Sequence, residues 1–183
     1  MNTSLLRIAK LRFSVCALLV MSSSLSIAVA RSQNQNADAA MELIREGSYY
    51  YLKHDFKAAI GPYQKALDLE KQKRTLDKTF WKVLIDNLGV AYGITGDLDK
   101  AKETFEYGIS KDPDYPLFYY NMACTYGEMK EMDKAIKYLK LAFDRHVNMI
   151  PGEKMPNPAT DSSFKRFMAD EKFQAALKEL KQK

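Results

Sequence analysis

The chain has 183 residues, of which 46% are apolar, 11% are aromatic and 28% are charged. Basic residues number 28 and acidic residues 23, which gives a formal net charge of +5. This composition is ordinary for a globular protein. It excludes collagen-like, low-complexity, disulfide-rich and strongly disordered chains.

The first 30 residues have the layout of a secretory signal peptide. They contain basic but no acidic residues, and an uncharged stretch runs from Phe13 to Ala30. The most apolar part ends at Met21, and Ala28-Val29-Ala30 forms a small-x-small cleavage motif. We expect cleavage after Ala30 and an exported protein, periplasmic or secreted. An uncleaved membrane anchor is the alternative, although this stretch is short and rich in serine for a hydrocarbon layer of ~30 Å.

Removal of residues 1–30 leaves 25 basic and 23 acidic residues in the mature chain. A nucleic-acid-binding protein would concentrate its basic residues in a stripe with a recognisable reading motif, and the sequence has neither, so we expect no nucleic-acid partner. Cys124 is the single cysteine of the mature chain, which excludes an intramolecular disulfide. A chain of about 150 residues can bury enough surface to fold by packing alone.

Residues 31–37 are expected to form a flexible start, and three helical hairpins are expected to follow, at about residues 38–73, 77–113 and 116–148. The segment that contains Asn87 and Tyr92 recurs with Asn121 and Tyr126 after a spacing of ~34 residues. Within each repeat, apolar and small residues recur at steps of three and four, and a turn interrupts the pattern near its middle. The repeats therefore predict pairs of amphipathic helices.

The last segment, residues 149–183, begins with a loop rich in proline and other turn-forming residues. Five large apolar residues follow it at helical spacing: Phe164, Phe167, Phe173, Leu177 and Leu180. Two short amphipathic helices are expected here.

The repeats resemble the tetratricopeptide repeat family. The match in the second and third repeats rests on Asn87-Leu88-Gly89, Tyr92, Gly96, Ala101, Phe105, Pro113, Asn121-Met122-Ala123, Tyr126 and Ala135. The first repeat is less similar, retaining Gly47, Tyr50, Ala59, Tyr63 and Ala66. The resemblance implies an all-α fold, a right-handed superhelix of three hairpins. The final segment looks like the C-terminal capping helices of bacterial exported members, which cover the open end of the last hairpin.

No motif of a catalytic or metal-binding site is found in the sequence. His54 and His146 are the only histidines, and neither has the spacing of a metal ligand pair. A glycine-rich phosphate loop and a Gly-x-Ser-x-Gly motif are also absent. His54 aligns with Gly96 and Lys130 of the later repeats, which favours a turn residue. We therefore expect no catalytic residue, no metal and no cofactor.

The resemblance also implies a binding surface, because the first helices of such hairpins line a concave groove that holds a peptide. It places Asn87 and Asn121 where an asparagine commonly bonds a peptide backbone, and Arg45 at the matching place in the first repeat. The other candidate groove residues are Ser48, Tyr51, Asp86, Val90, Tyr120 and Cys124. As an alternative, the asparagines brace neighbouring helices.

These features predict a binding protein rather than an enzyme. The expected function is that of an exported scaffold or adaptor that holds a protein or peptide of unknown identity in its groove. One alternative is a structural module, whose groove is filled by its own tail or by a second copy. The other is a small extracytoplasmic enzyme or an accessory subunit of one. Membrane association is expected only if the signal segment is retained.

Overall fold

The computed structural model describes residues 36–181. The signal segment expected at residues 1–30 lies outside the described residues, as does most of the start expected at 31–37. Residues 36 and 37, which were expected in that flexible start, are helical. Within the described range, no helix has the length and apolar character that crossing a membrane requires.

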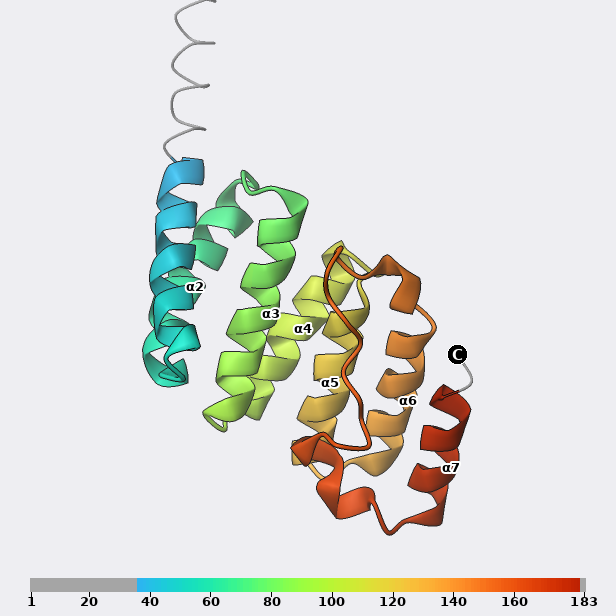
Figure 1. The fold of residues 1–183 in the computed structure, drawn as a ribbon. Coiled ribbons are helices and arrows are strands. Elements are labelled where there is room, and N and C mark those ends of the chain that lie inside the picture. Colours follow the sequence, from blue (N-terminus) through green and yellow to red (C-terminus); the bar gives the residue numbers. More distant parts are fainter. Residues whose placement is uncertain (1–35, 182–183) are drawn as a thin grey trace, which may run out of the picture. The chain divides into compact units, whose positions relative to one another are not determined.

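From Ala40 onward the chain forms one compact unit, and the regular elements described in it are all helices. The first hairpin pairs the helix of residues 36–52 with α2 (Phe56–Gln72). The second pairs α3 (Lys78–Ile94) with α4 (Leu98–Lys111), and the third pairs α5 (Pro116–Glu128) with α6 (Met132–Phe143). Each hairpin packs on the next, through α2 against α3 and α4 against α5 (Figure 1). The expected all-α superhelix of hairpins is confirmed.

The turn inside each hairpin has the same backbone conformation. His54, Gly96 and Lys130 occupy corresponding places, and all three have positive φ, at 59°, 88° and 64°. A helix cannot continue through a left-handed residue, so the first helix of each hairpin ends there. In the first two hairpins an aspartate then caps the next helix, since Asp55 accepts from the Ala58 amide and Asp97 from the Lys100 amide. The prediction that His54 is a turn residue is confirmed.

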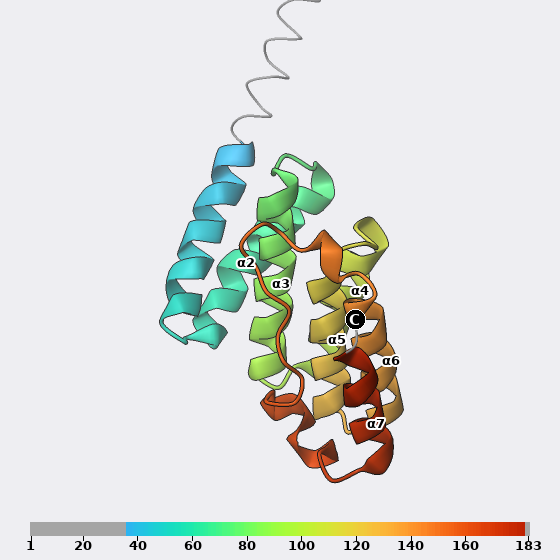
Figure 2. The same ribbon diagram turned by 45° about the vertical axis from the view of Figure 1, so that its right-hand side comes forward.

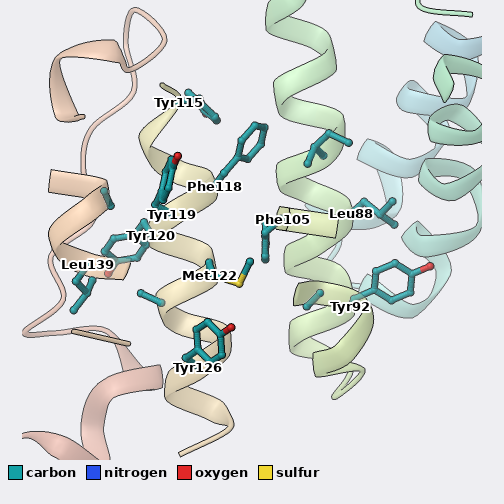
Figure 3. Packing of buried hydrophobic residues seen from close by; sticks show 14 of the residues in the cluster. Leu88, Tyr92, Phe105, Tyr115, Phe118, Tyr119, Tyr120, Met122, Tyr126 and Leu139 are labelled. Atoms are coloured by element: carbon teal, nitrogen blue, oxygen red, sulfur yellow. The ribbon is translucent and has the colours of Figure 1, made fainter. Parts of the chain in front are cut away.

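Small residues in the hairpins make room for aromatic rings. A Cβ atom built on Gly89 would lie 2.4 Å from Cζ of Phe105, and one built on Gly47 would lie 2.6 Å from Cδ1 of Tyr63. Glycine is therefore required at both places for the second helix to pack its ring against the first. Figure 3 shows Phe105 among the other buried residues of the second and third hairpins.

Tyr50 differs from its counterparts in the later repeats. Tyr92 and Tyr126 are buried, whereas Tyr50, which holds the same place in the first repeat, is only partly buried. Tyr92 also donates to Gln64 of the preceding hairpin at 3.0 Å. Within the described residues no hairpin precedes the first one, so Tyr50 lacks the neighbour that covers Tyr92.

The C-terminal segment covers the third hairpin. The third hairpin was expected to extend to about residue 148, but α6 ends at Phe143 and a separate 3-10 turn, η1 (His146–Asn148), follows. Residues 149–161, which we call the strap, lead to η2 (Ser162–Phe167) and α7 (Glu171–Leu180). η2 packs on α5 and α7 packs on α6, with Phe164 and Phe173 fully buried.

Candidate functional site

The strap lies on the inner side of α5, the side that carries Tyr115 and Tyr120. In Figure 1 it passes in front of α5 from one end toward the other, and in the turned view of Figure 2 it passes in front of α3. Two tyrosine hydroxyls hold it there. Tyr115 donates to Glu153 at 2.9 Å, and Tyr120 donates to Asp161 at 2.9 Å. Burial raises the pKa of both tyrosines, and the facing carboxylates raise them further. Both tyrosines therefore remain neutral donors at physiological pH, and the strap occupies the inner face of the third hairpin.

Two small residues of α5, Gly127 and Cys124, allow the strap and the backbone that follows it to approach this helix closely. A Cβ atom on Gly127 would lie 2.6 Å from the Ser163 carbonyl oxygen, so only glycine allows the backbone just after the strap to come so close. The Cys124 sulfur lies 3.6 Å from the Asp161 carboxylate. Burial and the Asp161 charge raise the pKa of the Cys124 thiol well above its ordinary value. Cys124 is thus a poor nucleophile and serves as a small residue under the strap.

Both asparagines bond to neighbouring helices. Asn87 of α3 donates to the Tyr63 hydroxyl of α2 at 3.1 Å, and Asn121 of α5 donates to Asp86 of α3 at 2.6 Å. Each bond joins the first helix of one hairpin to an element of the hairpin before it. This geometry matches the bracing alternative. Both amides are partly buried, and each of these contacts uses an amide hydrogen that a peptide backbone would otherwise accept.

The candidate residues of the first hairpin lie apart from those of the third. Arg45 is mostly exposed and pairs with Glu42 one turn away on its own helix. Ser48 shares a hydrogen bond of 3.0 Å with the Tyr63 hydroxyl. The Tyr51 ring packs edge-on against Phe56, with centroids 5.1 Å apart. The expected row of Arg45, Asn87 and Asn121 therefore does not present three equivalent groups.

Asp86 has an unusual electrostatic setting. Desolvation raises its pKa, the Asn121 amide opposes this by bonding the charged form, and the Glu153 carboxylate raises it again, to about 7. The Asp86 charge in turn contributes to raising the pKa of Tyr51 to about 12, where burial is the larger cause. Asp86 thus links the inner face of α3 electrostatically to the strap and to the first hairpin.

An open cleft of about 600 Å³ remains beside the strap, between the C-terminal halves of α3 and α5. Val90 and Ile94 of α3 and Leu98 and Phe105 of α4 supply its apolar lining. Its polar lining comes from α5 and from the start of η2, and comprises Asn121, Cys124, Thr125, Glu128, Asp161, Ser162 and Ser163. Ile94 is 57% exposed, an unusual fraction for a large apolar side chain.

Three of the nine predicted groove residues line this cleft, namely Val90, Asn121 and Cys124. Ile94 and Glu128 also line it, although neither was predicted. The repeat pattern gave no signal for them, because the cleft depends on where the strap ends and how far α3 and α5 separate. Within residues 36–181, no group of three or more histidine, cysteine or acidic side chains is arranged to hold a metal ion.

Comparison with known proteins identifies the repeats. Two tetratricopeptide repeat models match the chain, one at residues 84–115 and the other at residues 104–137. Residues 84–137 are tetratricopeptide repeats. The matched residues include most of α3, all of α4 and α5, and thus the helices that form the cleft. Such repeats build protein-binding scaffolds, and the resemblance inferred from the sequence is confirmed.

One solved structure supports the same fold. The chain resembles the crystal structure of the Yersinia enterocolitica type III secretion translocator chaperone SycD in an alternative dimer, with a TM-score of 0.54 and 19% identity. The match covers 79% of this chain and 93% of that chain. At this identity the likeness concerns the fold alone. Curated proteins give no match to the sequence.

Proposed function

We propose that the protein is an exported scaffold that binds a protein segment in the cleft between α3, α5 and η2. The observation that carries this proposal is the cleft itself, whose apolar lining is open to solvent beside a strap that fills the neighbouring inner face. Ligand sites commonly combine such apolar lining with a few convergent polar groups. The binding surface of the proposal is smaller than the full groove expected from the sequence, because the strap covers α5 at Tyr115 and Tyr120.

Export is the second part of the proposal and rests on the sequence of residues 1–30. If the segment is a cleaved signal, the protein isolated from its native host begins at Arg31. Measurement of the intact mass tests this. Retention of Met1 in a membrane fraction would contradict cleavage and would make the protein an anchored scaffold.

Site-specific photo-crosslinking in the native host tests binding at the cleft. A photoreactive amino acid at Ile94 should crosslink to a partner protein. The same group at Leu52 serves as the control, because Leu52 is also apolar and is 79% exposed, but lies on the first helix and does not line the cleft. A partner captured at Leu52 as readily as at Ile94 would place binding elsewhere.

A second step measures affinity for the partner that the crosslink identifies. The double substitution Val90→Gln and Ile94→Gln removes two apolar contacts without changing charge, and should weaken binding by ~10-fold or more. Leu52→Gln is the matched control and should leave affinity unchanged. Equal affinity of the double variant and the parent would show that the cleft is not the site.

A further inference from the structure

We propose that the cleft selects a segment in which an apolar side chain lies next to a lysine or arginine. This inference rests on the proposed function and names the chemistry of the partner. The apolar part follows from Val90, Ile94 and Leu98, which line the cleft and which an aliphatic side chain would contact. The cationic part follows from the charges and helix ends around these residues.

The polar lining of the cleft is acidic. Glu128 and Asp161 line it, and no lysine or arginine does. The mature chain as a whole has a small excess of basic over acidic residues, so this lining differs from the average surface. Glu128 is 41% exposed, and its carboxylate can therefore reach a group that enters from solvent. An acidic lining in a weakly basic protein complements a cationic ligand.

The ends of two helices add to this negative potential. α3 ends at Ile94 and α5 ends at Glu128, and both residues line the cleft. The C-terminal carbonyls of a helix carry a partial negative charge, which favours a nearby cation. Two N-termini also lie at the cleft, those of α4 and η2, but each already has an aspartate cap, Asp97 and Asp161. The Asp97 carboxylate offsets the positive end of α4, and η2, a 3-10 helix of six residues, is too short to add a comparable positive end.

Glu128 already has a cation beside it within the chain. A guanidinium nitrogen of Arg166 in η2 lies 3.6 Å from the Glu128 carboxylate, and both side chains are substantially exposed. Exposed ion pairs of this length stabilise a protein by little, so an incoming lysine or arginine can replace Arg166 at small cost. Arg166 thus indicates the kind of group that Glu128 accepts.

An acidic segment would meet repulsion on the same surface. Asp161 stays in place because Tyr120 and the Ser163 amide donate to it, at 2.9 and 3.0 Å. A third carboxylate beside Asp161 and Glu128 would find no basic side chain in the cleft lining. The cleft therefore discriminates by repelling anionic partners as well as by attracting cationic ones.

Two matched peptides provide the test. One fluorescein-labelled peptide alternates leucine with lysine, and the other has glutamate in place of every lysine. Fluorescence anisotropy with the full chain should show at least ~10-fold tighter binding of the lysine peptide, with a preference that decreases as salt rises. Glu128→Lys should lower the affinity of the protein for the lysine peptide ~10-fold. Arg166→Gln should raise this affinity, because a cation that competes for Glu128 is removed. Glu106→Lys is the control, since Glu106 is exposed on α4 away from the cleft and gives the same charge change.

The outcomes separate this inference from the proposed function. Equal binding of the two peptides, lost on Val90→Gln with Ile94→Gln, would keep the cleft as a binding site and overturn its charge preference. Preference for the glutamate peptide, or an equal effect of Glu128→Lys and Glu106→Lys, would also overturn it. If the neutral double substitution left the binding of the lysine peptide unchanged, the cleft would not be the binding site.

Discussion

The carboxyl group of Asp86 lies partly buried on the inner side of α3, where Asn121 donates to it and Glu153 faces it. Its pKa is about 7 in the folded chain, against an ordinary value of 3.8. Between these two pH values the folded state holds a proton that the unfolded chain has lost. The contribution of Asp86 to stability is therefore full below about pH 4, decreases as pH rises toward 7, and stays low above it.

Asp86→Asn should remove this pH dependence. Asparagine cannot ionise, and its amide oxygen can still accept from Asn121. At pH 8 the variant should be more stable than the parent by on the order of 2 kcal/mol, with a much smaller difference at pH 4. Urea unfolding at both pH values measures this. Asp99→Asn, an exposed substitution of the same type on α4, should change stability little at either pH, and an equal gain in both variants would contradict the argument.

Gly89 and Gly93 lie one turn apart on α3 but have different neighbours. A Cβ atom at position 89 would overlap the buried Phe105 ring, whereas one at position 93 would lie 3.9 Å from the Ala101 Cβ, an ordinary contact. Gly89→Ala should therefore destabilise the protein by roughly 1 to 3 kcal/mol. Gly93→Ala should be neutral or stabilising by up to about 1 kcal/mol, because alanine favours the helix. Thermal melts that rank the two variants in the opposite order would contradict the packing of α3 on α4.

The sequence predicted single residues well where their role repeats. His54, Gly96 and Lys130 could be aligned as turn residues because each follows a first helix of a hairpin. The bonding partner of Arg45 could not be predicted, because an alignment assigns a residue to a place in the repeat but does not identify the group that it contacts. Arg45 pairs with Glu42 on its own helix, whereas Asn87 reaches Tyr63 across a hairpin boundary.

Among the elements, the strap has the least local support. It contains no regular helix; the hydroxyl groups of Tyr115 and Tyr120 bond to it, and its Ile150 and Met155 side chains pack against the core. Replacement of both tyrosines by phenylalanine keeps the rings and removes the hydroxyls. We expect faster hydrogen exchange in residues 149–161 and a loss of stability of roughly 1 to 3 kcal/mol per hydroxyl, because the facing carboxylates lose a donor.

Tyr107→Phe is the control for this pair of substitutions. Tyr107 is partly buried, and Nζ of Lys71 lies 5.0 Å from the centroid of its ring. Its hydroxyl has no hydrogen-bond partner in the described part of the chain. The control should leave the exchange of residues 149–161 unchanged. A strap that exchanges equally fast in the parent and in the double variant would show that the hydroxyls do not hold it.

The helical hairpins could be predicted from the sequence, whereas the path of the strap could not. A helical hairpin is encoded by neighbours three or four residues apart, so the periodicity of each repeat was sufficient to predict it. The strap depends on bonds such as Tyr120 to Asp161, which are 41 residues apart. A loop rich in proline indicates its irregular backbone but not its path. A groove filled by the protein's own tail was one alternative expected from the sequence, and the strap has this arrangement on α5.

At the scale of the whole molecule, the C-terminal segment completes the hydrophobic core. Truncation after Met149 removes the buried side chains of Phe164, Phe173 and Leu177, each of which contributes on the order of 1.5 to 3 kcal/mol. The shortened protein should aggregate or melt far below the parent, as sedimentation and thermal melts would show. A chain that ends at Leu180 retains these side chains and is the control. Equal stability of the chain truncated after Met149 and the parent would make the segment an appendage.

The path of the strap has a consequence for the order of synthesis. The first two hairpins are formed by residues that leave the ribosome early, and each can pack on the one before it as it emerges. The inner face of the third hairpin remains uncovered until Glu153 and Asp161 follow, 38 and 41 residues after the tyrosines that bind them. We therefore expect the inner surface of α5 to stay unprotected for some time after this helix has emerged, and a nascent-chain chaperone to engage the protein during that interval.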